Sequence, residues 1–182
     1  MSKPHSHCSF CGARYPENLG WPRTCPACGG TAYRNPLPVA VVLIPVGEGI
    51  LVIRRLAPPR VGQLALPGGY INFGESWQEA GAREVMEETG VGIDPASIRE
   101  FRVRSAPDGT VLIFGISEPI DPAALAAFRP TSEAAECAVI HAPAELAFPL
   151  HAEAVAACFE RRKRAGTAPT MRAEEGISGS SG

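Results

Sequence analysis

The sequence predicts an α/β sandwich preceded by a small module that needs a metal or disulfides to hold it together. From residue 39 to about residue 164, aliphatic and β-branched runs alternate with helical patterns and are separated by Gly and Pro turns. Strands that surround helices in this order are typical of a sandwich. Residues 1–36 instead contain two Cys-x-x-Cys pairs and few aliphatic residues, so an apolar core cannot stabilise them alone.

The composition divides the chain into three parts. We expect a Cys-rich module over residues 1–36, one globular domain over residues 37–165, and a disordered tail over residues 166–182. The last five residues resemble a cloning remnant. Asn35, Pro36 and Pro38 mark the first boundary.

Each element of the domain has its own signal. Residues 39–44 form a buried aliphatic run, and Gly47-Glu48-Gly49 predicts a hairpin with residues 50–53. A short strand over residues 64–66 ends in Pro67-Gly68-Gly69. The remaining predicted elements are a hairpin of residues 98–104 and 111–116, a short helix after Asp121-Pro122, a strand over 137–141 and a helix over 151–164.

Charge and cysteine usage exclude some classes of protein. The net charge of −2 gives no overall attraction for nucleic acid or an anionic membrane, so we expect no membrane or nucleic-acid partner. No apolar run approaches the roughly 20 residues of a membrane helix, and residues 1–7 lack the apolar segment of a secretory signal. Six cysteines without such a signal predict a reducing, cytoplasmic setting.

The most informative segment is an acidic helix behind a glycine-rich loop. Ser76 and Glu79 form a capping box that begins the helix, and Gly90 suits its C-terminal cap. At 100° per residue, a single face holds three carboxylates, those of Glu84, Glu87 and Glu88.

The other residues of this helix should leave the carboxylate face open and pack the opposite face against the core. Ala80 and Gly81 lie one turn earlier and should leave space above the carboxylates. We expect the opposite side to face the core through Ala82, Val85, Met86 and Thr89. Clustered oxygens suit Mg²⁺ or Mn²⁺, whereas a solvated acidic face is the alternative. The neighbouring Pro67-Gly68-Gly69, which can bring backbone close to a ligand, favours the metal site.

This segment resembles the Nudix box of the Nudix hydrolases. The fixed positions of that box are matched by Gly69, Glu75, Arg83, Glu84, Val85, Glu87, Glu88, Gly90 and Val91. The resemblance implies an α/β/α sandwich with a mixed sheet, and a loop and helix that hold divalent metal against a diphosphate. It also implies that metal ligands come from Glu84, Glu87, Glu88 and the carbonyl of Gly69.

The same resemblance assigns supporting residues. Arg83 and Glu75 resemble the pair that orients the carboxylates. Family members often use a further glutamate as a base or ligand, and Glu133 and Glu136 are candidates; we favour Glu136 because it adjoins the predicted strand. For substrate binding we name Arg54, Arg55 and Arg60 for phosphate or ribose, and Phe73, Tyr70 and Phe114 for stacking on a base. Solvated loop charges and ordinary packing are the alternatives.

The two cysteine pairs resemble the knuckles of a zinc ribbon. Cys8, Cys11, Cys25 and Cys28 would supply four thiolates in a closed, structural Zn²⁺ site, and zinc would supply the folding free energy that the segment lacks. Disulfides or a redox pair are the rival interpretation. A homodimer also stays open, because the ribbon can serve as a dimerisation or substrate-gating element.

A zinc ribbon followed by a Nudix domain resembles the NADH pyrophosphatase branch and its ADP-ribose and FAD pyrophosphatase relatives. The resemblance implies Mg²⁺- or Mn²⁺-dependent hydrolysis of the pyrophosphate bond in a small-molecule nucleotide, releasing AMP and a second monophosphate. The chain lacks the Ser-Gln-Pro-Trp-Pro-Phe-Pro run of NADH pyrophosphatases, which favours ADP-ribose or FAD over NADH. The alternative is a nucleotide-sensing or nucleic-acid-binding regulator on a Nudix fold. Such a regulator could lose the glutamates of the box, whereas this chain has all of them.

Overall fold

The computed structural model describes residues 4–166, and the predicted tail lies outside them apart from its first residue. Close contacts divide the chain into two units, Met1–Leu37 and Pro38–Gly182, which are described separately. None of the helices within residues 4–166 combines the length and apolar character that crossing a membrane requires.

The first unit contains little regular structure. Strands β1 (Arg23–Thr24) and β2 (Thr31–Ala32) pair antiparallel. Its buried apolar cluster consists of Cys8, Tyr15 and Cys25, with Ala13 and Leu19 partly buried against it. So small a cluster cannot stabilise the unit by apolar burial alone.

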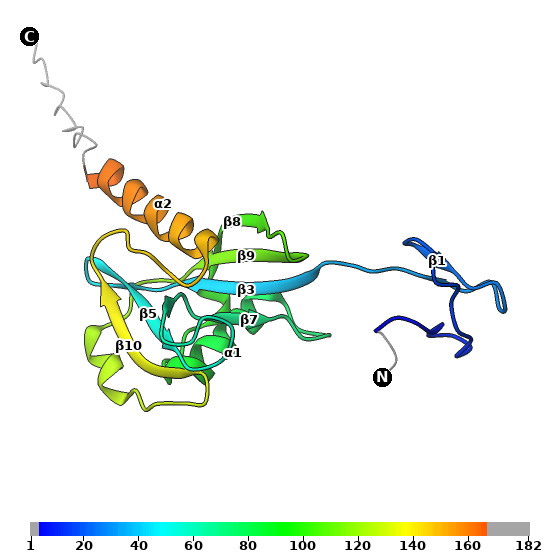
Figure 1. Cartoon of the computed structure of the whole chain (residues 1–182). Coiled ribbons are helices and arrows are strands. Elements are labelled where there is room, and N and C mark those ends of the chain that lie inside the picture. Colours follow the sequence, from blue (N-terminus) through cyan, green and yellow to red (C-terminus); the bar gives the residue numbers. More distant parts are fainter. Residues whose placement is uncertain (1–3, 167–182) are drawn as a thin grey trace, which may run out of the picture. The chain divides into compact units, whose positions relative to one another are not determined.

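The second unit contains two sheets (Figure 1). One has the order β7-β3-β9-β8, with strands Gly68–Tyr70, Leu37–Leu43, Thr110–Ile116 and Arg99–Ser105. The other has the order β10-β5-β4, with strands Ala134–Ile140, Gly49–Arg55 and Pro45–Val46; β6 (Leu64–Ala65) also pairs with β5.

The first predicted hairpin is corrected by this topology. Strand β3 lies between β7 and β9, so both of its edges are already paired, and the two-residue β4 forms the hairpin with β5. The aliphatic run therefore supplies strands to two different sheets. The second predicted hairpin is confirmed as β8 and β9. Strand β10 begins at Ala134 and includes Glu136, so it starts earlier than predicted.

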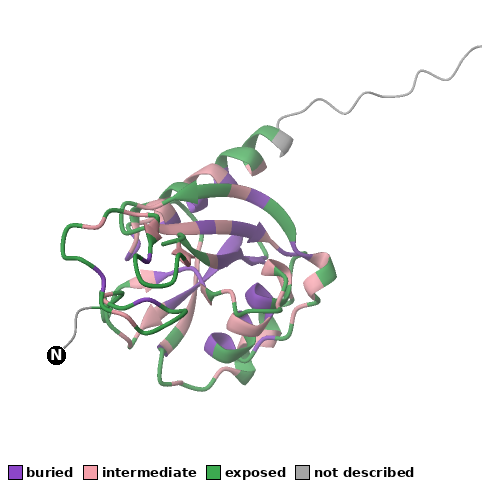
Figure 2. Cartoon of the chain, turned by 90° about the vertical axis from the view of Figure 1, so that its right-hand side faces the viewer, coloured by how far each residue is buried: buried purple, intermediate pink, exposed green. Residues whose placement is uncertain are grey.

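Helices lie on both sides of β3, with α2 (Pro149–Gly166) above it and α1 (Trp77–Thr89) below it in Figure 1. Successive strand residues point to opposite faces. Val41 and Leu43 accordingly pack with Val155 of α2, whereas Val42 packs with Val85 of α1. Figure 2 shows this buried interior between exposed outer faces. The predicted α/β/α sandwich is confirmed. Short 3₁₀ helices cover Pro95–Ser97 and Pro122–Ala127.

The ends of α1 are where the sequence predicts them, but parts of its surface differ. Ser76 and Glu79 form the capping box, and Gly90 ends the helix in the left-handed conformation with φ 73°. Met86 is exposed, so it does not face the core as predicted. A Cβ at Gly81 would come within 2.8 Å of Val42. Gly81 therefore allows α1 to approach β3 and leaves no space above the carboxylates.

His151 is a buried polar group in α2 that connects this helix to the loop before β7. Its Nδ1 accepts a hydrogen bond from the Leu66 N–H at 3.2 Å, and its ring contacts Phe114 and Phe148. Burial, together with the charge of Arg55, lowers the pKa of His151 from 6.5 to about 3. The folded protein therefore holds this side chain as the neutral imidazole.

This neutral histidine predicts a specific loss of stability in acid. Below pH 6.5 the unfolded chain binds a proton at His151 that the folded chain binds only near pH 3. Its contribution is thus complete above pH 6.5 and falls as the pH drops from 6.5 toward 3. His151→Asn keeps an acceptor for Leu66 without titrating. Between pH 7.5 and 5, wild type should lose about 2 kcal/mol more unfolding free energy than the variant in urea titrations. Parallel pH profiles would contradict this.

Candidate active site

The three carboxylates predicted on one face of α1 occupy different environments. Glu88 is buried, with 3% of its surface exposed. The side chains of Glu84 and Glu87 are 12% and 58% exposed. The face therefore runs from a buried acid at its base to a solvated acid at its rim.

The glycine-rich segment, predicted as a loop, forms strand β7 and lies directly against two of these acids. The Gly68 N–H donates a hydrogen bond of 2.9 Å to Oε2 of Glu88. A Cβ at Gly69 would lie 2.4 Å from the Glu84 carboxyl group, so a larger residue would force that carboxylate to move. The backbone of Gly69 is thereby held beside Glu84, as its predicted role requires.

Arg83 connects the acids of this site through its guanidinium group. Its Nε donates to Glu75 at 2.6 Å, and its Nη1 contacts Glu84 at 2.7 Å and Glu87 at 3.3 Å. Its Nη2 also donates to the Tyr70 carbonyl at 3.0 Å. The bond from Arg83 lowers the pKa of Glu75 to about 2, and Glu75 in return raises that of Arg83. Arg83 is therefore a permanent cation that orients its partners.

The surroundings of Glu84 and Glu88 disfavour their ionised forms. Burial, and then the charges of Glu84 and Glu133, raise the pKa of Glu88 to about 8 despite the Gly68 N–H. Burial likewise raises the pKa of Glu84, although Arg83 lowers it. Buried like charges of this kind are stabilised by a cation.

The charge of Glu133 acts on these acids. Glu133 raises the pKa of both Glu84 and Glu88. Glu136 forms an ion pair with Arg54, with a distance of 2.8 Å between Nη2 and Oε1. Arg54 and Glu136 are directly opposite each other on the paired strands β5 and β10. Cys137, the residue after Glu136, packs against the core cluster that contains α1 residues. Because successive strand residues point to opposite faces, Arg54 and Glu136 point to the face away from α1.

Arg54 and Arg55 are adjacent in β5, so their side chains point to opposite faces of the sheet. Arg55 donates to the carbonyls of Pro59 and Ala57 and lies 5.1 Å from the centre of the Phe148 ring. Its charge also lowers the pKa of Glu88. Arg55 is therefore the member of the pair on the side of the carboxylates.

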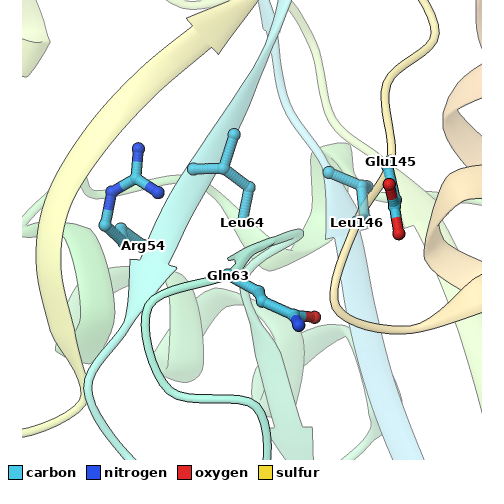
Figure 3. Close-up of a pocket in the computed structure, with 5 residues that line it drawn as sticks. All are labelled: Arg54, Gln63, Leu64, Glu145 and Leu146. Carbon is cyan, nitrogen blue, oxygen red and sulfur yellow. The ribbon is translucent and has the colours of Figure 1, made fainter.

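Arg54 instead lines a pocket of about 340 Å³ (Figure 3). The other lining residues are Gln63, Leu64, Glu145 and Leu146. Figure 3 shows Glu145 and Leu146 on the loop that precedes α2. No motif in the sequence identifies Gln63 or Glu145, because they reach this pocket only through the fold.

The predicted aromatic residues separate into two groups. Phe73 is fully exposed and Tyr70 is largely exposed, so both are available for stacking. Phe114 is completely buried in the core, so for this residue the alternative of ordinary packing applies. Its position in β9 points it toward α2.

Four cysteines form a compact group in the first unit. The thiol sulfurs of Cys8, Cys11, Cys25 and Cys28 all lie within 4.8 Å of one another, and all are free. Within residues 4–166 they are the sole group of His, Cys, Asp or Glu side chains found close enough to hold a metal ion. The Sγ atoms of Cys8 and Cys28 lie 3.7 Å apart, as do those of Cys11 and Cys25. A tetrahedron with Zn–S bonds of about 2.3 Å has edges of about 3.8 Å.

The ionisation of these thiols also suits a cation. Burial raises the pKa of Cys8, but hydrogen bonds from the N–H groups of Cys11 and Phe10 lower it to about 6. The Gly30 N–H lowers the pKa of Cys28, but hydrogen bonding to Cys11 and burial raise it to about 12. Neighbouring thiolates repel, so full ionisation needs a compensating cation.

Comparisons with known proteins agree with this geometry. Over about 50% of its length, the chain is 39% identical to the NAD-capped RNA hydrolase NudC of Stutzerimonas stutzeri across 94 residues, and 32% identical to that of Escherichia coli O1:K1 / APEC across 92 residues. The chain spans about a third of the length of these curated relatives, 33% and 35%.

Solved structures agree on the fold. A NUDIX hydrolase from Nitrosomonas europaea superposes with a TM-score of 0.73 and 25% identity, covering 87% of this chain and 93% of its own. A bifunctional NMN adenylyltransferase/ADP ribose pyrophosphatase from Francisella tularensis, complexed with AMP and a Mn ion, superposes with a TM-score of 0.51 and 24% identity. The superposition covers 59% of this chain and 34% of the other. This similarity concerns the fold alone. The family model for the NUDIX domain matches residues 35–159. Since this match spans more than half of the chain and contains the entire acidic helix with its glycine strand, the protein belongs to the NUDIX domain family.

Proposed function

We propose that the protein is a divalent-metal-dependent pyrophosphohydrolase that cleaves the phosphoanhydride of a nucleoside diphosphate linked to a second moiety. The observation that carries this proposal is the contact of Gly68 and Gly69 with Glu88 and Glu84. A backbone this close to the two acids can add its carbonyl oxygen to their carboxylate oxygens in one ion site.

The donor chemistry of the acidic face suits Mg²⁺ or Mn²⁺, although its three glutamates are not gathered into a metal-binding group in this structure, in contrast to the four thiols. A bound ion would have to draw them together. Its ligands would be Glu84, Glu87, Glu88 and the Gly69 carbonyl, all of them the hard oxygens that these ions prefer. When bound, the cation neutralises the diphosphate oxygens and lowers the pKa of the attacking water. Arg83 would orient the carboxylates of Glu84 and Glu87 through its ion pairs with them.

The surrounding residues would position the substrate and the water. Glu133 is the better candidate for the general base, because its charge reaches Glu84 and Glu88, whereas Glu136 is paired with Arg54. Arg55 would contact a phosphate, since its charge acts at Glu88. Arg54 would bind the polar part of the second moiety from its pocket, and the exposed Phe73 would stack on a ring.

We infer that the substrate is a dinucleotide or nucleotide sugar that yields AMP and a second monophosphate. The zinc ribbon followed by a Nudix domain resembles dinucleotide and ADP-ribose pyrophosphatases, and the missing Pro-Trp-Pro-Phe run disfavours NADH. Zinc in the four-cysteine module would be structural, because four thiolates leave no open position. A reducing cytoplasm suits six free cysteines.

AMP release from a panel of nucleotides with Mg²⁺ or Mn²⁺ tests this function. The panel contains ADP-ribose, FAD, NADH, diadenosine polyphosphates and nucleoside triphosphates. The glutamates contact only metal and phosphate, so specificity depends on flanking contacts worth about 1–3 kcal/mol. We expect ADP-ribose or FAD to lead by roughly tenfold to a hundredfold in kcat/KM.

The same assay separates the alternatives. A nucleoside triphosphate preferred by more than about a hundredfold would contradict the substrate class. Nucleotide binding without AMP release would indicate a sensor in place of an enzyme. Glu133→Gln should lower kcat more than Glu136→Gln; the reverse order would return the base to Glu136.

A second candidate substrate is an RNA whose 5′ end carries a dinucleotide pyrophosphate. It is favoured by the two NAD-capped RNA hydrolases that the chain resembles, and its scissile bond is chemically the same. This candidate opposes the expectation from net charge that no nucleic acid is bound. Adding a NAD-capped oligonucleotide to the panel decides between the two candidates.

A further inference from the structure

Strand β8 carries two arginines on the face that α2 covers. Arg102 lies opposite Phe114 and Arg104 lies opposite Leu112 in the β8–β9 register, and both partners belong to the core cluster packed against α2. The register shifts between Glu100 and Arg102. Such a bulge re-aims the side chains that follow it, so two guanidinium groups occupy the edge of an apolar face.

A third guanidinium group reaches the same place from α2. Arg161 lies 4.1 Å from the centre of the Phe101 ring, and Arg102 lies 5.4 Å from it. Burial, then the charges of Arg104 and Arg161, lower the pKa of Arg102, while Glu153 raises it. Three cations from two elements therefore lie close enough to repel one another.

These cations lack anionic partners within residues 4–166. Among the residues that the structure describes, no ion pair involves Arg102, Arg104 or Arg161. Arg102 donates to the Glu153 carbonyl and Arg104 to the Val103 carbonyl. The Nε atom of Arg102 is buried without any hydrogen-bond partner. A buried, unpaired donor is costly. Arg104 and Arg161 are exposed, so an external anion can reach the cluster through them.

The chemistry of the cluster favours phosphate in a polymer. Guanidinium groups bind phosphate oxygens with two parallel hydrogen bonds. Arg102 and Arg104 are two residues apart on one strand, so their Cα atoms are about 6.6 Å apart, comparable to the separation of successive phosphates in a nucleic acid strand. Phe101 is buried in the core, so the site offers charge without a platform for base stacking.

We propose that Arg102, Arg104 and Arg161 bind the phosphodiester backbone of a single-stranded RNA. This inference rests on the second candidate substrate of the proposed function. The contacts to phosphate would hold the RNA without reading its bases.

Fluorescence anisotropy with a labelled 5′-monophosphate RNA of about twelve nucleotides tests the site, because this RNA is a reaction product and needs no hydrolysis. Arg104→Gln and Arg161→Gln should each weaken binding several-fold at low salt. Each should also reduce the slope of log K against log salt by about 0.7, the value for one phosphate contact in single strands. The double variant should lose both contacts.

Arg129→Gln is the matched control, since Arg129 is exposed and its guanidinium group donates to the carbonyls of Ala126 and Phe128. An equal loss of RNA binding in this control, or unchanged binding in Arg104→Gln, would overturn the inference. So would oligoglutamate of equal charge binding as well as RNA, because the partner would then be an acidic protein. Hydrolysis of ADP-ribose should be unchanged in Arg104→Gln. Absent hydrolysis in wild type would contradict the proposed function instead.

Discussion

Glu88→Gln should abolish most of the hydrolytic activity and leave the fold intact. Glutamine keeps an oxygen that can accept the Gly68 N–H but removes the charge of a proposed metal ligand. Metal ions supply several kcal/mol of transition-state stabilisation, so kcat should fall at least about a hundredfold, each 1.4 kcal/mol being tenfold. The melting temperature without metal should stay level or rise, because burial already opposes the charge of Glu88.

Glu79→Gln on the same helix is the control for this experiment. It makes the same change in charge within the capping box, where Gln also functions, so activity should stay near that of wild type. The measurement is AMP release at saturating Mg²⁺, together with a thermal melt in its absence. Near-normal turnover of Glu88→Gln would refute the metal assignment, and so would a change in Glu79→Gln as large as that in Glu88→Gln.

Cys25→Ser should release zinc and unfold the first unit. Cys25 is almost completely buried, and the unit otherwise has only a small apolar cluster. Structural zinc contributes about 10–16 kcal/mol of apparent binding free energy in zinc-finger peptides, so no other interaction of this unit can compensate. Elemental analysis should find about one zinc per wild-type chain and almost none in the variant.

The second unit should keep its own unfolding transition in this variant, because its core clusters include no residue of the first. Cys137→Ser provides a matched control: the same replacement outside the four-cysteine group should leave the zinc content unchanged. A wild-type protein without zinc, or one with intact disulfides in reducing buffer, would rule out the ribbon. Loss of zinc in Cys137→Ser would show that the metal lies elsewhere.

Local sequence does not reveal which side chains meet across strands. The local sequence around Glu136 made it the favoured base, yet β10 pairs it with Arg54, and only the fold reveals the influence of Glu133. Similarly, the sequence alone could not assign Arg54 and Arg55 to opposite faces. A two-residue periodicity is visible in a sequence, but which face meets the site depends on sheet pairing.

What the sequence by itself determined is the local chemistry. The capping box at Ser76, the left-handed cap at Gly90 and the shared face of the glutamates follow from helix periodicity and from contacts within a few residues. Only the tertiary structure decided which acid is buried, which arginine faces the carboxylates, that Phe114 lies in the core, and that β3 and β4 belong to different sheets. These features depend on contacts between residues far apart in the chain, and no local pattern specifies them.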